Sequence, residues 1–396
     1  MPSPSIELFA YPWDIADTGV AAFAAECRRL GVTRLHVTTL YHSGKFLLPR
    51  NGATKVALPA GGTAYVPLDG GSLGELAPAE DPLARAGWLE ELAAEGLPLS
   101  AWTVFHHNSR IGGRRPDLTV RNAFGDSYPF ALCPHHPEVR RYSVALARSI
   151  ASLRVFDTLD LESIGWLGYE HGHHHEVAAG PIGPYEKFLL SLCFCPACAA
   201  VARADGLDLE ALAARVRTLL LAKLAADDSG TRPHANMEQV AALVAQSPEL
   251  QHLIRLRLEA VTGLVRDIVA AAGGAKVSVF TSSFVGSPGN IWMEGVALRA
   301  LRDAVDGFHL LAYTPDTCAV NDDLLYCLSE VDDPARLNLT LNLGLPVTPA
   351  LGDALAKIEF ARRHGVRRFS FFNYGFLGSG RLEWIARIAA AVSKTG

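Results

Sequence analysis

Four cysteines are the residues whose types and spacing point most directly to chemistry in this chain. Cys193, Cys195 and Cys198 lie within six residues of one another, and Cys133 lies sixty residues before Cys193. Three thiols this close cannot all pair without strain, but their thiolates can surround one soft cation, usually zinc. A shell of four protein ligands has no open position, so the sequence predicts a structural zinc ion. The alternative is a set of reduced cysteines buried in the core.

Two carboxylates, Asp160 and Glu162, are separated by one residue in a segment with the composition of a buried strand. Alternation along a strand places both side chains on the same face. Burial and mutual repulsion raise the pKa of at least one of them, as a general acid requires. Glu162 lies nearer the end of the strand, so we predict that it donates the proton, with Asp160 as a candidate base or nucleophile. The alternative is a pair of acids held in salt bridges by Arg or Lys.

Residues 171–176 form a third group, with the sequence H-G-H-H-H-E. Neutral imidazoles and a carboxylate can bind a catalytic metal such as zinc or nickel. The same side chains can instead hydrogen-bond and protonate a substrate, or lie in a solvated loop. Histidines at positions i, i+2 and i+4 of a loop converge on one ion only where the backbone is fixed. We therefore favour substrate contact by His171 and His173.

The elements that must position these groups alternate between short apolar strands and amphipathic helices. Eight strand–helix units follow one another, and their strands are apolar almost throughout, as strands buried on both faces are. This pattern predicts a single (β/α)8 TIM barrel over residues 1–396. The alternative is a doubly wound open sheet, but the glycine-rich turn that often follows its first strand is missing. The expected strands are residues 6–11, 34–40, 99–105, 158–166, 276–280, 308–313, 337–342 and 368–373.

Two insertions depart from a minimal barrel. Residues 44–82, after the second strand, are rich in Gly and Pro and predict a hairpin-like excursion over the mouth of the barrel. Residues 181–272, after the fourth strand, have apolar residues at three- and four-residue spacing, which predicts helices. Both insertions follow the C-terminal ends of strands, where barrel active sites form.

The strand ends of such a barrel carry an unusually polar set of side chains. Aromatic rings stack on the faces of pyranose sugars, while imidazoles, amides and carboxylates bond the hydroxyl groups. The predicted ligand is therefore a carbohydrate, either a small molecule or an oligosaccharide. The substrate-binding residues predicted at the strand ends are Trp13, Asp14, His42, His106, His107, Asn108, Trp166, His171, His173, Tyr313 and Asn373. Glu170 and Asp316 are further catalytic candidates.

The composition narrows the class of protein. Hydrophobic residues make up 49% of the 396, which indicates a well-buried globular chain. The net charge of -5 offers no basic surface for nucleic acid. No run of eighteen apolar residues and no apolar leader is present, so we expect a cytoplasmic protein that does not span a membrane. Seven cysteines, an odd number, do not suggest a disulfide framework. A homo-oligomer is compatible with this sequence.

The cysteine motifs also carry a family resemblance. The segments L-C-P-H-H-P-E-V-R, around Cys133, and L-C-F-C-P-A-C, ending at Cys198, resemble the zinc-binding cysteines of family 42 β-galactosidases and related barrel glycosidases. The resemblance implies a retaining glycosidase with a Glu acid/base on the fourth strand, which corresponds to Glu162, and a Glu nucleophile on the seventh. The Asn-Glu pair typical of that family is Leu161-Glu162 here, and residues 342–346 contain no carboxylate.

We therefore expect a glycoside hydrolase-like enzyme with a structural four-cysteine zinc site. Glu162 would be the general acid, and a second carboxylate would act as base or nucleophile. A wide gap between the two carboxylates would give an inverting mechanism with an activated water. Two other functions stay open: a metallohydrolase that uses residues 171–176, and a barrel that binds carbohydrate without cleaving it.

Overall fold

A computed structural model gives the fold and describes residues 4–169, 171, 177, 182–225, 237–282 and 286–393. Eight parallel strands form its centre, and β1 pairs with both β2 and β14, so the sheet closes into a barrel. The predicted (β/α)8 TIM barrel is confirmed, and the open-sheet alternative is wrong. In chain order the barrel strands are β1 (Ser5–Ala10), β2 (Arg34–Tyr41), β7 (Leu99–Val104), β10 (Thr158–Glu162), β11 (Lys276–Phe280), β12 (Gly307–Ala312), β13 (Leu337–Asn342) and β14 (Arg368–Phe372).

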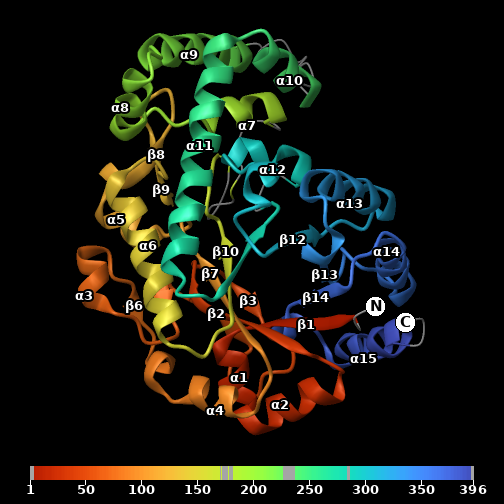
Figure 1. The fold of residues 1–396 in the computed structure, drawn as a ribbon. Helices are drawn as coiled ribbons and strands as arrows, with labels where there is room; N and C mark the ends of the chain where they lie inside the picture. The colour runs from red at the N-terminus through yellow and green to blue at the C-terminus, as the bar shows by residue number, and fades with distance from the viewer. Residues whose placement is uncertain are drawn as a thin grey trace.

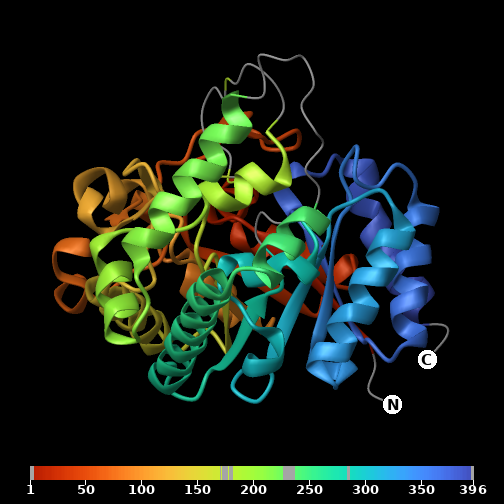
Figure 2. The same ribbon diagram turned by 90° about the horizontal axis from the view of Figure 1, so that it is seen from above.

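Helices surround the barrel on the outside, as Figures 1 and 2 show from two directions. The strands are buried along most of their length, because one face packs against these helices and the other fills the barrel interior. The helices between and after the strands are α1 (Pro12–Thr18), α2 (Val20–Arg29), α4 (Trp88–Ala94), α6 (Pro137–Ser152), α11 (Pro248–Ala271), α12 (Leu298–Leu301), α13 (Thr317–Val331), α14 (Leu351–Arg363) and α15 (Ser379–Ser393).

The segment after β2 adds short strands at one edge of the barrel. β3 (Phe46–Leu47) and β4 (Val56–Ala57) form an antiparallel hairpin. β5 (Thr63–Ala64) then pairs antiparallel with the end of β2 and parallel with β6 (Ala79–Glu80). The helix α3 (Gly70–Leu73) lies between β5 and β6 in the chain. This segment therefore extends the barrel sheet beside the end of β2.

The segment after β10 supplies a group of helices that stands away from the barrel, at the top of Figure 1. The helices before α11 are α7 (Pro184–Leu190), α8 (Pro196–Ala204), α9 (Leu209–Ala225) and α10 (Met237–Ala245). The long helix α11 packs along α6 and leads the chain back to β11. These helices extend the molecule on the side of β10.

An excursion between β7 and α6 was not anticipated from the sequence. It consists of α5 (Ser109–Arg114) and the antiparallel pair β8 (Thr119–Arg121) and β9 (Ser127–Leu132). Its short strands lack a repeated apolar pattern long enough to be recognised. The excursion ends directly before Cys133, so it determines where this cysteine lies.

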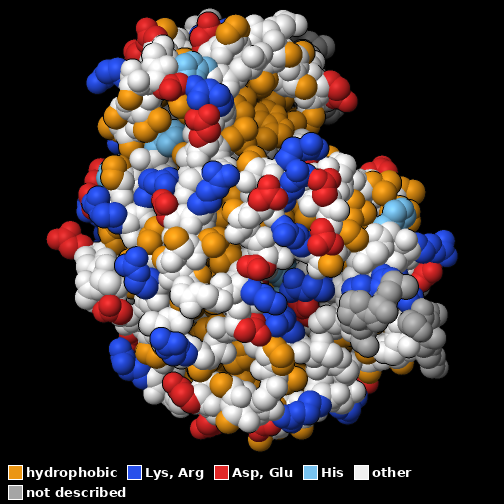
Figure 3. All heavy atoms as spheres, in the orientation of Figure 1, with side chains coloured by type: hydrophobic (Ala, Val, Ile, Leu, Met, Phe, Trp, Pro, Cys, Tyr) orange, Lys and Arg blue, Asp and Glu red, His pale blue; other side chains and the backbone are white. Residues whose placement is uncertain are grey.

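On the face drawn in Figure 3, basic and acidic side chains are interspersed, and apolar side chains gather in a hollow beside the upper helices. Leu221 and Leu224 of α9 are among the large apolar residues that are exposed. Within the residues that the structure describes, no helix is both long enough and apolar enough to cross a membrane.

Candidate functional site

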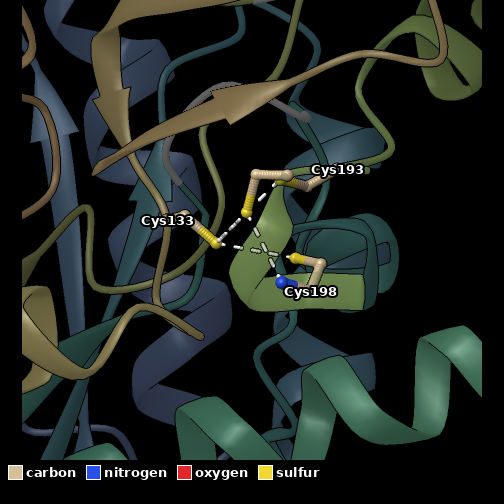
Figure 4. Close-up of side chains that lie close together, drawn as sticks. Cys133, Cys193 and Cys198 are labelled. Atoms are coloured by element: carbon tan, nitrogen blue, oxygen red, sulfur yellow. Dashed lines mark hydrogen bonds between the residues drawn. The ribbon is translucent and has the colours of Figure 1, made fainter. Parts of the chain in front are cut away.

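The four cysteines converge, as Figure 4 shows for Cys133, Cys193 and Cys198. The Sγ atom of Cys133 lies 3.5 Å from that of Cys195, 3.6 Å from that of Cys198 and 3.9 Å from that of Cys193, and all four are buried. Disulfide sulfurs would be about 2.05 Å apart. Four thiolates around a tetrahedral ion, with bonds of about 2.3 Å, lie about 3.8 Å from one another. The spacing therefore fits a metal ion, and the group can hold one.

The surroundings of this cluster favour a thiolate at Cys195, whereas burial raises the pKa of Cys133 and hydrogen bonds from the neighbouring thiols raise the pKa of Cys198. The backbone N–H of Arg121 donates to Cys193 at 3.4 Å, and Nδ1 of His135 lies 3.3 Å from the sulfur of Cys198. Hydrogen bonds from the neighbouring thiols lower the pKa of Cys195 far below its usual value. Arg257, fully buried in α11, brings a positive charge whose interaction with the cysteine sulfurs is favourable. The cluster is thus a connected polar unit at the base of the upper helices.

Asp160 lies in the barrel interior and not at the mouth. Its carboxylate bonds Nδ1 of His36 at 2.6 Å and Nε2 of His309 at 3.0 Å. His36 also bonds Glu7 at 2.7 Å, and Glu7 accepts a hydrogen bond from Arg368 at 2.9 Å. Burial alone would raise the pKa of Asp160, but the charges and hydrogen bonds of the two histidines lower it. Asp160 thus occupies a salt-bridged network, which corrects the prediction that it is a catalytic base or nucleophile.

The group His36, Asp160 and His309 is also compact enough to be considered for a metal ion. Its N–O separations of 2.6 and 3.0 Å are hydrogen-bond lengths. Across a tetrahedral ion with bonds of about 2.0 Å, the separation would be about 3.3 Å. Both nitrogens of His36 face carboxylates, and these carboxylates raise its pKa against the opposing effect of burial. The spacing of the group is that of a hydrogen-bonded network.

Glu162, the last residue of β10, lies at the C-terminal end of the barrel and is partly exposed. Its carboxylate accepts a hydrogen bond from the indole N–H of Trp102 on β7. Burial raises the pKa of Glu162 to about 7, the Trp102 hydrogen bond opposes this rise, and the charge of Glu294 adds to it. A carboxyl group with this pKa can both hold and release a proton near neutral pH.

Aromatic side chains surround this carboxyl group. The hydroxyl of Tyr11 donates to that of Tyr41 at 2.8 Å, and the Tyr41 ring meets the edge of Trp102 with centroids 5.0 Å apart. Trp13 stacks on Tyr11 with centroids 4.3 Å apart, while Tyr313 packs against Phe372 at 5.6 Å. The sequence predicted Trp13 and Tyr313 here but not Tyr11, Tyr41 or Trp102. Their signal was their position at or near the ends of β1, β2 and β7.

A cavity of about 550 Å³ opens at the ends of β11 and β12. Leu311 and Tyr313 give it apolar surface, and the pKa of Tyr313 is raised first by burial and then by the charge of Glu162. The polar lining residues are Ser282, Ser287, Thr314, Asp322 and Asp323. Ser287 donates to Asp323 at 2.6 Å, which joins the segment after β11 to helix α13. The cavity can therefore contact a ring face and bond hydroxyl groups, and its lining residue Tyr313 is close enough to Glu162 to be affected by its charge.

Three histidines from different strand ends lie together. The rings of His42 and His107 stack with centroids 4.3 Å apart, and Nε2 of His171 lies 3.1 Å from Nδ1 of His107. Burial lowers the pKa of His42 and of His107, so both imidazoles are neutral at neutral pH. His171 belongs to neither of the groups that can hold a metal among the described residues. Glu170, His173 and the rest of 172–176 lie outside the described residues.

Three of the predicted substrate-binding residues are buried and contact protein groups. His106 bonds Gly165 and Ser143, and burial lowers its pKa to about 4. Trp166 has no exposed surface and packs under the guanidinium of Arg257 at 4.7 Å. Asp14 is buried beside Asn51, and burial raises its pKa to about 7. These placements correct the predictions for His106, Trp166 and Asp14.

Three other predicted residues cap helices. The side chain of Asn108 accepts from the N–H of Ile111 at the start of α5. Asp316 accepts from the N–H groups of Cys318 and Ala319 at the start of α13. Asn373 is buried and accepts from the N–H of the second residue after it, at the turn η7 (Tyr374–Phe376). Short polar side chains at these positions satisfy backbone donors, so Asn108, Asp316 and Asn373 have structural roles here.

Comparison with known proteins agrees with this architecture. The closed eight-stranded barrel is the fold of TIM-barrel glycoside hydrolases, among them the glycoside hydrolase domain of PgaB (BpsB) from Bordetella bronchiseptica. That domain has a TM-score of 0.61 and 12% sequence identity, with 98% of this chain and 99% of that chain covered. The catalytic domain of a β-amylase from Paenibacillus polymyxa has a TM-score of 0.58 and 13% identity, with 98% of each chain covered.

A β-galactosidase from Bacillus circulans sp. alkalophilus is similar over 100% of this chain and 57% of its own length, with a TM-score of 0.58 and 13% identity. No protein-family model matches this chain, and no curated protein matches it in sequence. At these identities the structural likeness shows the fold, and the function must be argued from the site.

Proposed function

We propose that this protein is a glycoside hydrolase in which Glu162 is the general acid. The observation that carries this proposal is the position of the Glu162 carboxyl group and its raised pKa. Glu162 ends a barrel strand on the side where barrel enzymes have their active sites, and burial raises its pKa to about 7. A general acid works best when its pKa lies near the operating pH.

The surroundings of Glu162 support a carbohydrate substrate. The cavity beside Tyr313 combines apolar ring surface with hydroxyl and carboxylate groups, which suits the alternating faces and hydroxyls of a sugar. In the proposal Trp13 and Tyr313 stack on sugar rings. The neutral imidazoles of His42 and His107, together with the ring of His171 beside them, bond hydroxyl groups.

The second catalytic carboxylate in this proposal is Glu170. It directly precedes His171 in the sequence, and the ring of His171 contacts His107 at the mouth. Asp160 and Asp14 are buried in the interior and Asp316 caps α13, which leaves Glu170 and Glu176 among the substitute carboxylates, and we choose Glu170 because it is next to His171. In an inverting enzyme it would activate water, and in a retaining one it would attack the sugar.

We also propose that the ion at Cys133, Cys193, Cys195 and Cys198 is zinc. The sulfur spacing, the buried setting and four soft ligands support this choice. With every ligand supplied by the protein, the ion would hold structure and take no part in the reaction. A reduced compartment such as the cytoplasm would keep these thiols available.

The test is the variant Glu162→Gln, assayed on unactivated oligosaccharides such as lactose, cellobiose, maltotriose and chitobiose. These poor leaving groups need protonation, so turnover should fall by about 10²- to 10⁴-fold. The variant should stay folded, with an unfolding temperature no lower than that of the wild type, and should still bind sugar. Glu90→Gln, which changes an exposed Glu of α4, is the matched control and should keep full activity. Turnover unchanged in Glu162→Gln would exclude the assignment, and binding without turnover in the wild type would favour a carbohydrate-binding barrel.

A further inference from the structure

The indole ring of Trp102 is held in one orientation by its neighbours. Trp102 lies on β7 and is buried, and its ring meets Phe9, Tyr41 and Phe372 edge to face, with centroids 5.2, 5.0 and 5.7 Å apart. Edge-to-face contacts at these distances are favourable and directional. The ring cannot turn without breaking all three, so its N–H group has a fixed direction.

That N–H group is directed at Glu162. Nε1 of Trp102 donates to Oε2 of the carboxyl group. An indole N–H is a donor only and accepts nothing, so the oxygen that it bonds must present a lone pair. In a protonated carboxyl group the carbonyl oxygen is a better acceptor than the hydroxyl oxygen, so this bond favours Oε2 as the carbonyl oxygen and Oε1 as the oxygen that carries the proton.

We infer that Trp102 is a positioning residue that reserves Oε1 as the proton-bearing oxygen of Glu162 and stabilises the carboxylate left after proton donation. This inference rests on the proposed function, in which Glu162 donates a proton to the leaving group. The hydrogen bond is made in both states of the acid and strengthens when the carboxyl group becomes charged. Trp102 thus assists the step in which the proton leaves Oε1.

The other groups that face Glu162 do not replace this bond. Tyr41, at the end of β2, and Tyr11 and Tyr313, directly after β1 and β12, interact with its charge. Burial raises the pKa of each well above its usual value, so all three stay neutral. Glu294, from the turn η5 (Pro288–Glu294), is a negative charge and raises the pKa of Glu162. Removing the indole donor therefore leaves burial and Glu294 to raise the pKa of Glu162 further.

Trp102→Phe removes the N–H group and keeps an aromatic ring. The pKa of Glu162, measured by difference infrared spectroscopy against the Trp102→Phe/Glu162→Gln double variant, should rise by about one pH unit. The basic limb of the pH profile of kcat/KM should move upward by the same amount, and kcat should fall about tenfold. A merely structural role of the ring would lower activity without moving this limb.

Trp166→Phe is the matched control. Trp166 is equally buried, and its indole N–H has no hydrogen-bond partner among the described residues. This variant should leave the pKa of Glu162 and the basic limb where they are in the wild type. An unchanged pKa and an unmoved limb in Trp102→Phe would overturn the inference.

A measurement on the unaltered protein covers the case in which Trp102→Phe does not fold. The chain has six tryptophans, so a ¹⁵N–¹H spectrum contains six indole signals. One of them should titrate near pH 7 and lose this titration in Glu162→Gln. If no indole signal titrates between about pH 5 and pH 9, where a carboxyl group with this pKa changes charge, the inference is wrong. If one does titrate but Glu162→Gln retains turnover, the proposed function fails while the coupling of the two residues stands.

Discussion

Replacing Glu162 with glutamine should make the protein more stable at alkaline pH and leave its stability unchanged in acid. The cause is the cost of ionising a buried carboxyl group. In the unfolded chain this group loses its proton above the ordinary value of 4.5, whereas burial keeps it protonated in the folded chain up to about pH 7. Between these values the folded state binds more protons than the unfolded state, so the free energy of unfolding falls as the pH rises.

The size of this effect follows from the difference between the two pKa values. One pKa unit corresponds to 1.36 kcal/mol, so a rise from 4.5 to about 7 costs about 3 kcal/mol once the group is charged. Glutamine cannot ionise, and its side-chain oxygen can still accept from Trp102. Glu162→Gln should therefore gain about 3 kcal/mol relative to the wild type at about pH 8 and nothing at about pH 4.

Urea unfolding of both proteins at the two pH values measures this difference directly. A constant change in packing would shift both measurements alike, so only the pH-dependent part bears on the argument. Glu90→Gln, at an exposed position of α4, should show no such pH dependence. An equal difference at both pH values would refute the reasoning that Glu162 is an acid held protonated by its surroundings.

Two further predictions concern the other polar clusters. Cys195→Ser should reduce the zinc content, measured by elemental mass spectrometry, from one ion per chain to none. It should also lower the unfolding temperature, because a metal held by protein ligands stabilises the folded state. A second ion that is lost on changing His173 would favour the metallohydrolase instead. Asp160→Asn should cost about 3–5 kcal/mol in urea unfolding, because it removes the buried negative charge that His36 and His309 share. The exposed change Asp303→Asn is its control, and equal stability of the two variants would show that the interior network is not ionic.

Much of the barrel could be predicted, because strands buried on both faces leave long apolar runs in the sequence. The alternation along β10 also correctly placed Asp160 and Glu162 on the same side of the strand. The sequence could not predict that Asp160 lies in the barrel interior and Glu162 at the mouth. The environment of each carboxylate depends on which side chains the other strands place at the same height in the barrel. His36 and His309, which hold Asp160, come from positions 124 residues before it and 149 residues after it.

The site residues that were wrongly predicted share one explanation, which is that their strands end earlier than the sequence suggested. The fourth strand was expected to reach residue 166, but it ends at Glu162, and Ser163 has a φ of +54°, in the left-handed region. The chain turns there, so Trp166 packs against Arg257 instead of facing the mouth. Likewise β7 ends at Val104, and His106 and His107 then face opposite directions. His106 meets Ser143 of α6, whereas His107 stacks on His42.

The four-cysteine cluster has a consequence for where the sequence of this protein can be altered. Cys133 follows the excursion after β7, and Cys193 begins the segment that leads into α8, so the cluster joins two excursions from neighbouring barrel strands. The chain between Glu162 and Cys193 is therefore anchored at both ends, by the barrel sheet and by the sulfur cluster. The entropic cost of closing a loop rises only slowly as the loop becomes longer. Under the proposed function, insertions and substitutions between these anchors would change substrate specificity while the barrel sheet and the sulfur cluster are kept.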